Sequence, residues 1–388
     1  MEASTRMLLS RAGRLVPRGQ PILFSSSPSA CNDTSAKQYR HNHSLALAGQ
    51  ASRRPYLPQS STSTRSIQPD THSRASSHSP MAPSSPTTPP RKKVTLHTID
   101  ALYRRNEPIT MITAHDFPSA HVADQNGMDM VLVGDSLAMV ALGMEDTSAV
   151  LEEEMLLHCR SVARGAPTAF LVGDLPMGSY EISPAQALTT AIRFIKHGRM
   201  HAVKLEGGAA MAPTVAAVVR AGIPVLAHVG LTPQRQNALG GFRVQGRTAA
   251  AALQVLADAR AVEAAGAFAV VLEAVPAEVA AYVTRRIGIP TIGIGAGAGC
   301  SGQVLVQVDM SGNFPPGRFL PKFVKKYGDV WGEASRAIAQ YRDEVKSRAY
   351  PAKEHTYPMK KEEVEEFERL TALLDDAEAK AEREFPES

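Results

Sequence analysis

The segment MDMVLVGDSL (residues 128–137) combines a short apolar strand with a carboxylate placed directly at its end. Met130 to Val133 have the continuous apolar character of a strand that is buried on both faces. Gly134 and Asp135 follow at once, so this strand delivers an acid to its carboxyl end. A single aspartate there could simply cap the next helix. The same pattern recurs along the chain, and the recurrence indicates the fold.

Seven further apolar runs share this character, and polar or alanine-rich helical segments separate most of them. The eight predicted strands are ITMITA (109–114), DMVLVG (129–134), AFLVGD (169–174), HAVKLE (201–206), PVLAHVG (224–230), FAVVLE (268–273), PTIGIG (290–295) and VLVQVD (304–309). Eight strands alternating with helices predict a (β/α)₈ TIM barrel, and an open doubly wound sheet is the alternative. Continuous apolar runs throughout favour closure. Between Gly295 and Val304 there is no room for a full helix, so we expect an abbreviated seventh unit.

The ends of the chain differ from this central part. Residues 1–91 are dominated by Ser, Pro, Thr and Arg, a composition that predicts disorder. Within them, STRMLLSRAGRLVPR (4–18) places arginines on one helical face and leucines on another, which is typical of a mitochondrial transit peptide. A merely disordered tail is the alternative. We therefore expect a disordered transit and linker segment over 1–91, a catalytic barrel over 92–330 and a helical extension over 331–388.

The extension contains two predicted helices, GDVWGEASRAIAQYRDEVKSR (328–348) and KKEEVEEFERLTALLDDAEAKAERE (360–384). The second is highly charged and carries a thin apolar stripe, which suits either a solvated appendage or a partner-binding helix. The stripe consists of Val364, Phe367, Leu370 and Leu374.

Charge and cysteine content exclude several classes of function. The formal net charge is +4, but the first 90 residues hold nine Arg and one Lys against three acids, which leaves the remainder slightly acidic. This distribution argues against a nucleic-acid-binding surface. Three cysteines without a CxxC pair predict neither a disulfide framework nor a thiolate metal site. The apolar runs are far shorter than the roughly 20 residues that a membrane span requires, so we expect no membrane partner.

Polar side chains stand at or near the carboxyl ends of five consecutive predicted strands. In a barrel these ends converge on the face where active sites of this fold lie. Carboxylates crowded there repel one another and resist desolvation unless a cation lies between them. Oxygen ligands suit Mg²⁺, which keeps several waters, although each acid alone could equally be a helix cap or an ion-pair member. The five residues are Asp135, Asp174, Glu206, His228 and Glu273.

Two further side chains belong to the same predicted barrel mouth. Lys204 lies two residues before Glu206, so both side chains point to the same side of their strand. A buried lysine needs an anion, which is either a neighbouring acid or a substrate carboxylate. Ser136 could donate its hydroxyl to that anion, cap the following helix, or do both.

The glycine run GIGAGAGCSG (293–302) contains a formal match to the dinucleotide-binding pattern GxGxxG. That pattern must open a helix, whereas a predicted strand follows here, so we reject a nucleotide site. We interpret these glycines as residues of tight turns beside the barrel mouth, and not as a nucleotide-binding loop.

Eight motif blocks distributed over about residues 93–355 resemble those of the ketopantoate hydroxymethyltransferase family, in the same order. They are ITMITAHDF, VLVGDSLAMV, GMEDT, VKLEGG, AHVGLTPQ, GGFRVQGR, LEAVP and IGIGAGAGCSGQVLV. The resemblance implies a barrel of the phosphoenolpyruvate/pyruvate type. It also implies Mg²⁺-dependent transfer of a hydroxymethyl group from 5,10-methylenetetrahydrofolate to 3-methyl-2-oxobutanoate, an α-keto acid, which gives 2-dehydropantoate for pantothenate and coenzyme A biosynthesis. Such enzymes are homo-oligomers, commonly decamers in bacteria.

The motifs also assign roles by resemblance. Asp135 in VGDS, Asp174 in GDLP and Glu206 in KLEG match the acids of the family's metal site. Glu273 in LEAVP matches the general base. The positions that match substrate contacts are Ser136, Lys204 and His228.

The chain departs from the family pattern at His115, Met177 and Ser301, where Tyr, Phe and Asp are usual. None of these departures falls on a metal or base position, and Ser301 lies in the glycine-rich loop. A lyase or mutase of the same barrel type that works without folate is a rival reading. Such enzymes usually carry a catalytic cysteine or a phosphate-binding loop, whereas Cys159 falls in a helical stretch and Cys300 in the glycine-rich loop.

Another rival, a barrel that has lost catalysis and serves as a scaffold, would be supported by the loss of an active-site residue. Asp135, Asp174, Lys204 and Glu273 are all present.

Overall fold

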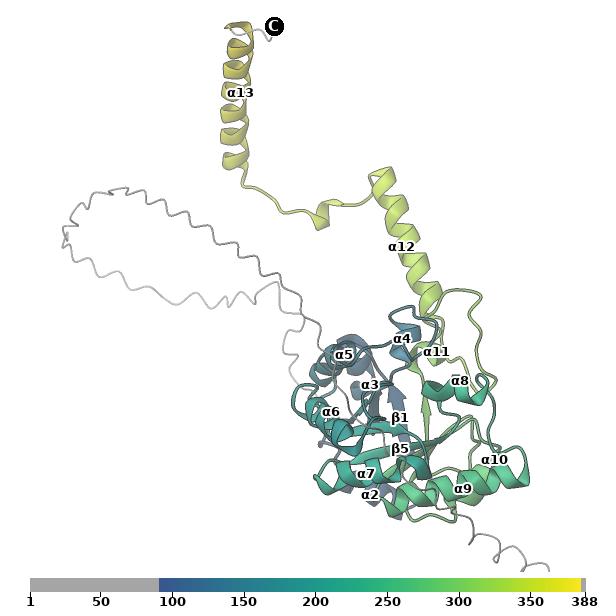
Figure 1. Ribbon diagram of the computed structural model, residues 1–388. Coiled ribbons are helices and arrows are strands. Elements are labelled where there is room, and N and C mark those ends of the chain that lie inside the picture. The colour runs from purple at the N-terminus through teal and green to yellow at the C-terminus, as the bar shows by residue number, and fades with distance from the viewer. Residues whose placement is uncertain (1–90, 385–388) are drawn as a thin grey trace, which may run out of the picture. The chain divides into compact units, whose positions relative to one another are not determined.

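The computed structural model describes residues 91–384, and eight parallel strands in it close into a barrel (Figure 1). Each strand pairs with the next along the chain and β8 pairs with β1, so the predicted (β/α)₈ barrel is confirmed. The strands are β1 (Ile109–Thr113), β2 (Met130–Val133), β3 (Phe170–Asp174), β4 (Ala202–Glu206), β5 (Val225–Gly230), β6 (Ala269–Glu273), β7 (Thr291–Ile294) and β8 (Gly302–Leu305). The predicted disordered and transit segment lies outside the described residues apart from Arg91, and the domain boundaries at 92 and 330 stay predictions.

Helices surround the strands, and local sequence signals start several of them (Figure 1). Asp116 and Ser119 form a capping box at the first turn of α3, and Thr248 caps α9 through its hydroxyl. The helices up to the end of the barrel are α2 (Leu96–Arg104), α3 (Phe117–Gln125), α4 (Leu137–Val140), α5 (Glu152–Gly165), α6 (Pro184–Lys196), α7 (Ala212–Arg220), α8 (Gln236–Leu239), α9 (Ala249–Ala264), α10 (Ala277–Thr284) and α11 (Gln307–Ser311), with 3₁₀ turns η1 (Ala209–Met211) and η2 (Pro233–Arg235).

Alternate side chains of each strand enter two separate apolar clusters. On β4, Val203 and Leu205 pack into the layer between barrel and helices, whereas Ala202 belongs to the cluster inside the barrel. Val94, just before α2, and Ile99, within α2, also belong to that inner cluster. The period of two puts every second residue inside, so the inner positions beyond the apolar cluster carry the polar residues of the barrel mouth. Other members of the inner cluster are Met111, Met130, Phe170, Val172, Leu226, Val271 and Val304.

The last strand differs from its prediction, because β8 covers Gly302–Leu305 rather than residues 304–309. It pairs with Ile109 to Ile112 of β1, and a side chain at Gly302 would stand 2.4 Å from the Ile109 carbonyl oxygen. Glycine therefore permits closure at this seam. The alternating apolar residues after Leu305 continue into α11 and not into a longer strand. The abbreviated seventh unit is confirmed, since no helix separates β7 from β8.

Two helices follow the barrel, α12 (Val330–Ser347) and α13 (Lys361–Glu384), with a 3₁₀ turn η3 (Lys353–His355) between them. Both helices agree with the sequence prediction. The predicted stripe of α13 is exposed, with Phe367 58% and Leu374 61% accessible to solvent. Across residues 91–384, none of the helices has the length and apolar content needed to cross a membrane.

His201, just before β4, gives the fold a measurable sensitivity to acid. Its Nδ1 accepts a hydrogen bond of 2.9 Å from the Leu171 amide, and burial together with Lys93 lowers the pKa of His201 to about 4. The unfolded chain binds this proton near pH 6.5, so the folded state loses stability as the pH falls from about 6.5 to 4. The parent should lose unfolding free energy between pH 7.5 and pH 5, and we expect His201→Asn to lose about 1 kcal/mol less, after allowance for solvent screening of the half-buried ring. Urea unfolding at both pH values measures this difference. Equal losses of unfolding free energy in the parent and the variant would contradict the prediction.

Candidate active site

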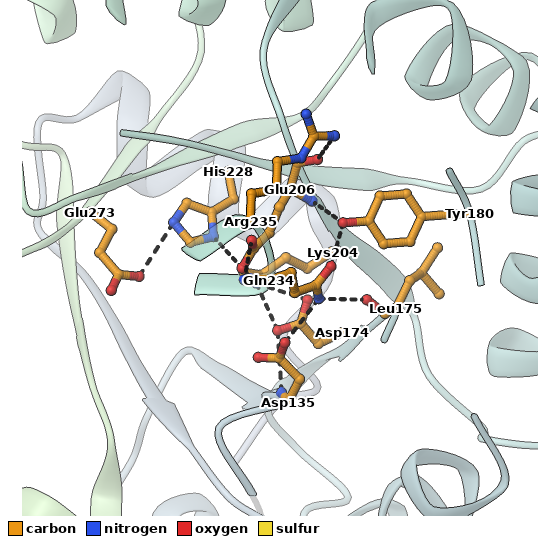
Figure 2. Close-up of polar contacts among 10 residues, drawn as sticks. All are labelled: Asp135, Asp174, Leu175, Tyr180, Lys204, Glu206, His228, Gln234, Arg235 and Glu273. Atoms are coloured by element: carbon orange, nitrogen blue, oxygen red, sulfur yellow. Dashed lines mark hydrogen bonds and ion pairs between the residues drawn. The ribbon is translucent and has the colours of Figure 1, made fainter. Parts of the chain in front are cut away.

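Strand register brings the predicted polar residues together at the barrel mouth (Figure 2). Asp174 of β3 is the register partner of Lys204 on β4, and Glu206 is the partner of His228 on β5. Paired positions on neighbouring parallel strands face the same side of the sheet, so these side chains share the barrel interior. Glu273, at the end of β6, contacts His228.

Lys204 forms the centre of the charge cluster. Its Nζ lies 2.8 and 2.7 Å from the two carboxylate oxygens of Asp174, and 3.8 Å from Glu206 Oε1. Burial opposes the charge of this ammonium, but the surrounding carboxylates outweigh burial and raise the pKa of Lys204. Of the two predicted anions, the neighbouring acid is therefore the one that Lys204 contacts in this structure.

Asp135 and Asp174 form a pair of buried carboxylates. The Asp135 amide donates to Asp174 Oδ2 at 3.3 Å, and both side chains are almost inaccessible to solvent. Burial raises the pKa of each acid, while the ammonium of Lys204 opposes that shift. Four carboxylates, those of Asp135, Asp174, Glu206 and Glu273, thus share the ammonium of Lys204 and the imidazole of His228, which leaves the cluster short of positive charge.

The donor set fits a hard cation. Among residues 91–384, no three His, Cys, Asp or Glu side chains are spaced to hold a metal ion by themselves. Mg²⁺ does not require such a cage, since it is usually held by one or two carboxylates together with waters and substrate oxygens. Asp135 and Asp174 supply two carboxylates, and Glu206 Oε1 is buried without a hydrogen-bond partner. These oxygen donors suit Mg²⁺ better than a metal that prefers sulfur or nitrogen.

His228 bridges two carboxylates. Its Nδ1 lies 3.4 Å from Glu206 Oε1 and its Nε2 lies 3.3 Å from Glu273 Oε2. Burial lowers the pKa of the imidazole, but the two carboxylates outweigh burial and raise the pKa of His228 to about 9. The imidazole thus lies between Glu206 and Glu273 at ion-pair distance from each, without a hydrogen bond to either.

Glu273 combines a fixed backbone with a partly open side chain. Its side chain is 17% exposed, in contrast to the fully buried acids beside it. Ala274, the next residue, has a φ of 47°, and Gly230 on β5 has a φ of 95°. A side chain at Gly230 would stand 2.4 Å from the Glu273 carbonyl oxygen. The backbone therefore turns sharply at Ala274, directly after Glu273, and Gly230 on the neighbouring strand leaves room for this turn.

Ser136 lies at the N-cap position of α4, as one of its two predicted roles requires. Its hydroxyl makes no capping hydrogen bond, however, so capping of α4 does not explain why a serine stands at this position. The rejected nucleotide motif ends in β8 and opens no helix, as the sequence indicated.

Sequence reasoning assigned no role to Tyr180 and Gln234, which the structure places within the cluster (Figure 2). Both are buried, and Gln234 Nε2 donates to Asp135 Oδ2 at 2.9 Å. Gln234 stands in the AHVGLTPQ block, six residues after His228 in the chain, and only the path of the loop after β5 brings it to Asp135.

Comparison with known proteins identifies the family of this chain. Residues 93–353 match the sequence profile of the family described as ketopantoate hydroxymethyltransferase. The chain belongs to the ketopantoate hydroxymethyltransferase family. It is 66% identical over 301 residues to the 3-methyl-2-oxobutanoate hydroxymethyltransferase of Emericella nidulans, a match that covers 78% of this chain and 86% of that relative.

Other ketopantoate hydroxymethyltransferases show similar coverage. The 3-methyl-2-oxobutanoate hydroxymethyltransferase of Oleidesulfovibrio alaskensis is 56% identical over 69% of this chain and 92% of its own length. A protein of Oryza sativa subsp. japonica named 3-methyl-2-oxobutanoate hydroxymethyltransferase 2, mitochondrial, is 50% identical over 73% of this chain and 71% of its own length. Among solved structures, phosphoenolpyruvate phosphomutase from Streptomyces platensis subsp. rosaceus is more distantly similar, with a TM-score of 0.45 and 16% identity over 75% of this chain and 99% of that chain.

Proposed function

We propose that this protein transfers a hydroxymethyl group from 5,10-methylenetetrahydrofolate to 3-methyl-2-oxobutanoate and so forms 2-dehydropantoate for pantothenate and coenzyme A biosynthesis. The observation that carries the proposal is the convergence of the family's acids and lysine in one cluster at the barrel mouth, with Glu273 at its edge. The high identity to relatives that bear this activity in their names supports it.

The substrate needs a base, because its C3 proton is only weakly acidic. Glu273 is the most open acid of the cluster, and we assign it the removal of that proton. His228 Nε2 lies 3.3 Å from Glu273 Oε2, and we assign the ring a contact to the substrate beside this base. The carbanion formed at C3 then makes a carbon–carbon bond to the methylene carbon of the folate. Both carbon–nitrogen bonds of that carbon break in the overall reaction: water supplies the oxygen of the product hydroxyl group, the two nitrogens take up protons, and tetrahydrofolate leaves.

The metal site is the second part of the proposal. Asp135 and Asp174 would hold Mg²⁺, and Glu206 is the third acid that we assign to it. Bound Mg²⁺ would draw electron density from the keto oxygen and so make the C3 proton easier to remove. Lys204 and Ser136 contribute a positive charge and a hydroxyl donor toward the substrate carboxylate. Lys204 can do so because it already lies in the same buried layer as the acids.

A direct assay tests the reaction and the metal requirement together. The purified protein is incubated with 3-methyl-2-oxobutanoate, 5,10-methylenetetrahydrofolate and Mg²⁺, and in parallel with excess EDTA. We expect 2-dehydropantoate only in the first reaction, with recovery of activity when Mg²⁺ is restored. Product formation at an equal rate with EDTA would exclude the metal, and no product in either reaction would exclude the activity.

We further propose that the protein is a homo-oligomer. On α12 the side chains of Trp331, Ile338, Tyr341 and Val345 are all at least 40% exposed. They are seven, three and four residues apart, which places them on one face of the helix, as in a helix that packs against another helix. A second copy of the chain is the partner that the family relation suggests, and a decamer is the assembly common among bacterial members.

Oligomer formation gives a prediction about Ile338, which is 69% exposed. A charge placed there would be buried in the proposed contact, so Ile338→Glu is expected to shift the mass measured by multi-angle light scattering to a smaller species. Gln340→Glu adds the same charge to the opposite face of α12 and should leave the mass of the parent unchanged. A parental mass for Ile338→Glu would remove α12 from the interface.

Mitochondrial localisation is proposed from the N-terminal sequence and from the mitochondrial name of the rice relative. The arginine-rich, acid-poor composition of the first 90 residues supports it. A fluorescent protein fused to residues 1–90 should enter mitochondria, and cytosolic fluorescence would contradict the proposal.

A further inference from the structure

The side chain of Gln234 is buried, and each of its polar atoms has a defined partner (Figure 2). Its Nε2 donates to Asp135 Oδ2 and to the Leu175 carbonyl oxygen, both at 2.9 Å. Its Oε1 accepts a hydrogen bond of 2.5 Å from the Tyr180 hydroxyl. The two amide hydrogens and the amide oxygen are therefore all used, which is the complete satisfaction that a buried amide requires.

Tyr180 holds the oxygen end of this amide in place. The Tyr180 hydroxyl accepts from the Glu206 amide at 3.2 Å, so its own hydrogen is available for Gln234 Oε1. A flipped amide would aim Nε2 at the hydroxyl and place Oε1 against the Asp135 carboxylate and the Leu175 carbonyl oxygen, which are both acceptors. The Asp135 carboxylate and the Leu175 carbonyl oxygen thus exclude the flipped orientation, and the Tyr180 hydroxyl donates to Oε1 in the orientation that remains.

Gln234 also reaches the second acid of the cluster through its backbone. Its amide N–H donates to Glu206 Oε2 at 3.1 Å. One residue in the loop after β5 therefore contacts the carboxylates of Asp135, which follows β2, and of Glu206, which ends β4. Gln234 carries no charge, so its contribution is geometric and is separate from the charge balance that Lys204 supplies.

We propose that Gln234 is a positioning residue for the metal site, which sets the directions of the Asp135 and Glu206 carboxylates, and that Tyr180 acts by fixing the Gln234 amide. The inference rests on the proposed function, because it concerns the same site. With Asp135 Oδ2 held by the amide and Glu206 Oε2 held by the backbone, the other oxygen of each carboxylate is left for the cation. Glu206 Oε1 agrees with this division, because it makes no hydrogen bond with the described residues and has ion-pair contacts alone, to His228 Nδ1 at 3.4 Å and Lys204 Nζ at 3.8 Å.

The test compares three single variants of the full chain, together with the Gln234→Met/Tyr180→Phe double variant. Gln234→Met keeps the length of the side chain and removes all three hydrogen bonds, and Tyr180→Phe keeps the buried ring and removes the hydroxyl. Thr190→Val is the matched control, because the Thr190 hydroxyl is also buried and donates to the Ser179 carbonyl oxygen at 2.8 Å, outside this network. Mg²⁺ affinity in the presence of 3-methyl-2-oxobutanoate is measured by calorimetry, with thermal unfolding followed in parallel.

We expect Gln234→Met to weaken Mg²⁺ binding about 10- to 100-fold, Tyr180→Phe to weaken it by a smaller factor, and Thr190→Val to bind as the parent does. The double variant should bind no more weakly than Gln234→Met alone, because Tyr180 acts through Gln234. Parental affinity in Gln234→Met overturns the inference, and an additive loss in the double variant overturns the role of Tyr180. If Gln234→Met does not fold, Tyr180→Phe decides by the same measurement. A parent protein that binds no Mg²⁺ with the keto acid refutes the proposed function itself, whereas a parent that binds and a Gln234 variant that binds equally refutes only this inference.

Discussion

Glu273→Gln is expected to lower kcat about 10³-fold while 3-methyl-2-oxobutanoate still binds in the presence of Mg²⁺. The amide has almost the size of the carboxylate but cannot accept a proton, so the substrate remains bound without losing its C3 hydrogen. The exchange of that hydrogen for deuterium, followed by NMR without folate, isolates this step from the transfer. We expect exchange to be lost together with turnover.

Glu278→Gln is the matched control for this experiment. Glu278 lies in the first turn of α10, five residues after Glu273, and is exposed. The same chemical change there should leave exchange and turnover at the parental rates. Exchange that persists at the parental rate in Glu273→Gln would show that another group is the base.

Lys204→Met is expected to destabilise the protein by about 3–5 kcal/mol, because it leaves buried carboxylates without their ammonium partner. In the parent, Lys204 contacts Asp174 at 2.7 Å and Glu206 at 3.8 Å while nearly inaccessible to solvent. Methionine fills a similar volume, so the loss reports on charge and not on a cavity. Urea unfolding measures it.

Addition of Mg²⁺ should recover part of that stability, since a bound cation would replace the missing positive charge and binding favours the folded state. Lys196→Met, at an exposed position in the last turn of α6, should change the unfolding free energy by less than about 0.5 kcal/mol. A loss for Lys204→Met as small as that of Lys196→Met would mean that the carboxylates are not held as a charged cluster.

Much of the fold follows from the sequence because short, continuous apolar runs carry the barrel strands. Residues 202–206 show why the site follows as well: Val203 and Leu205 mark the outward face, so Lys204 and Glu206 must point inward. The prediction extended the last strand too far, to residue 309, because polar and apolar residues alternate after Gly302 as they do in a strand. The partner strand β1 ends at Thr113, so the chain leaves the sheet and forms α11 instead.

Tyr180 and Gln234 could not be predicted in the same way. Strand periodicity gives the direction of a side chain within a strand, but these residues lie in the loops after β3 and β5. The path of a loop depends on hydrogen bonds between segments far apart in the chain, such as those from Gln234 to Asp135 and Leu175. No local pattern of residues indicates such bonds.

The period of two in the strands separates the parts of the chain that an engineer could change from those that should be kept. Outward positions such as Val131, Val203 and Val270 belong to the apolar cluster between the barrel and the helices, so repacking them would alter thermostability while leaving catalysis intact. Inward positions near the mouth offer no such freedom, because each one also contacts a residue of a neighbouring strand. Libraries for a more heat-resistant enzyme should therefore vary the outward residues and fix the inward ones.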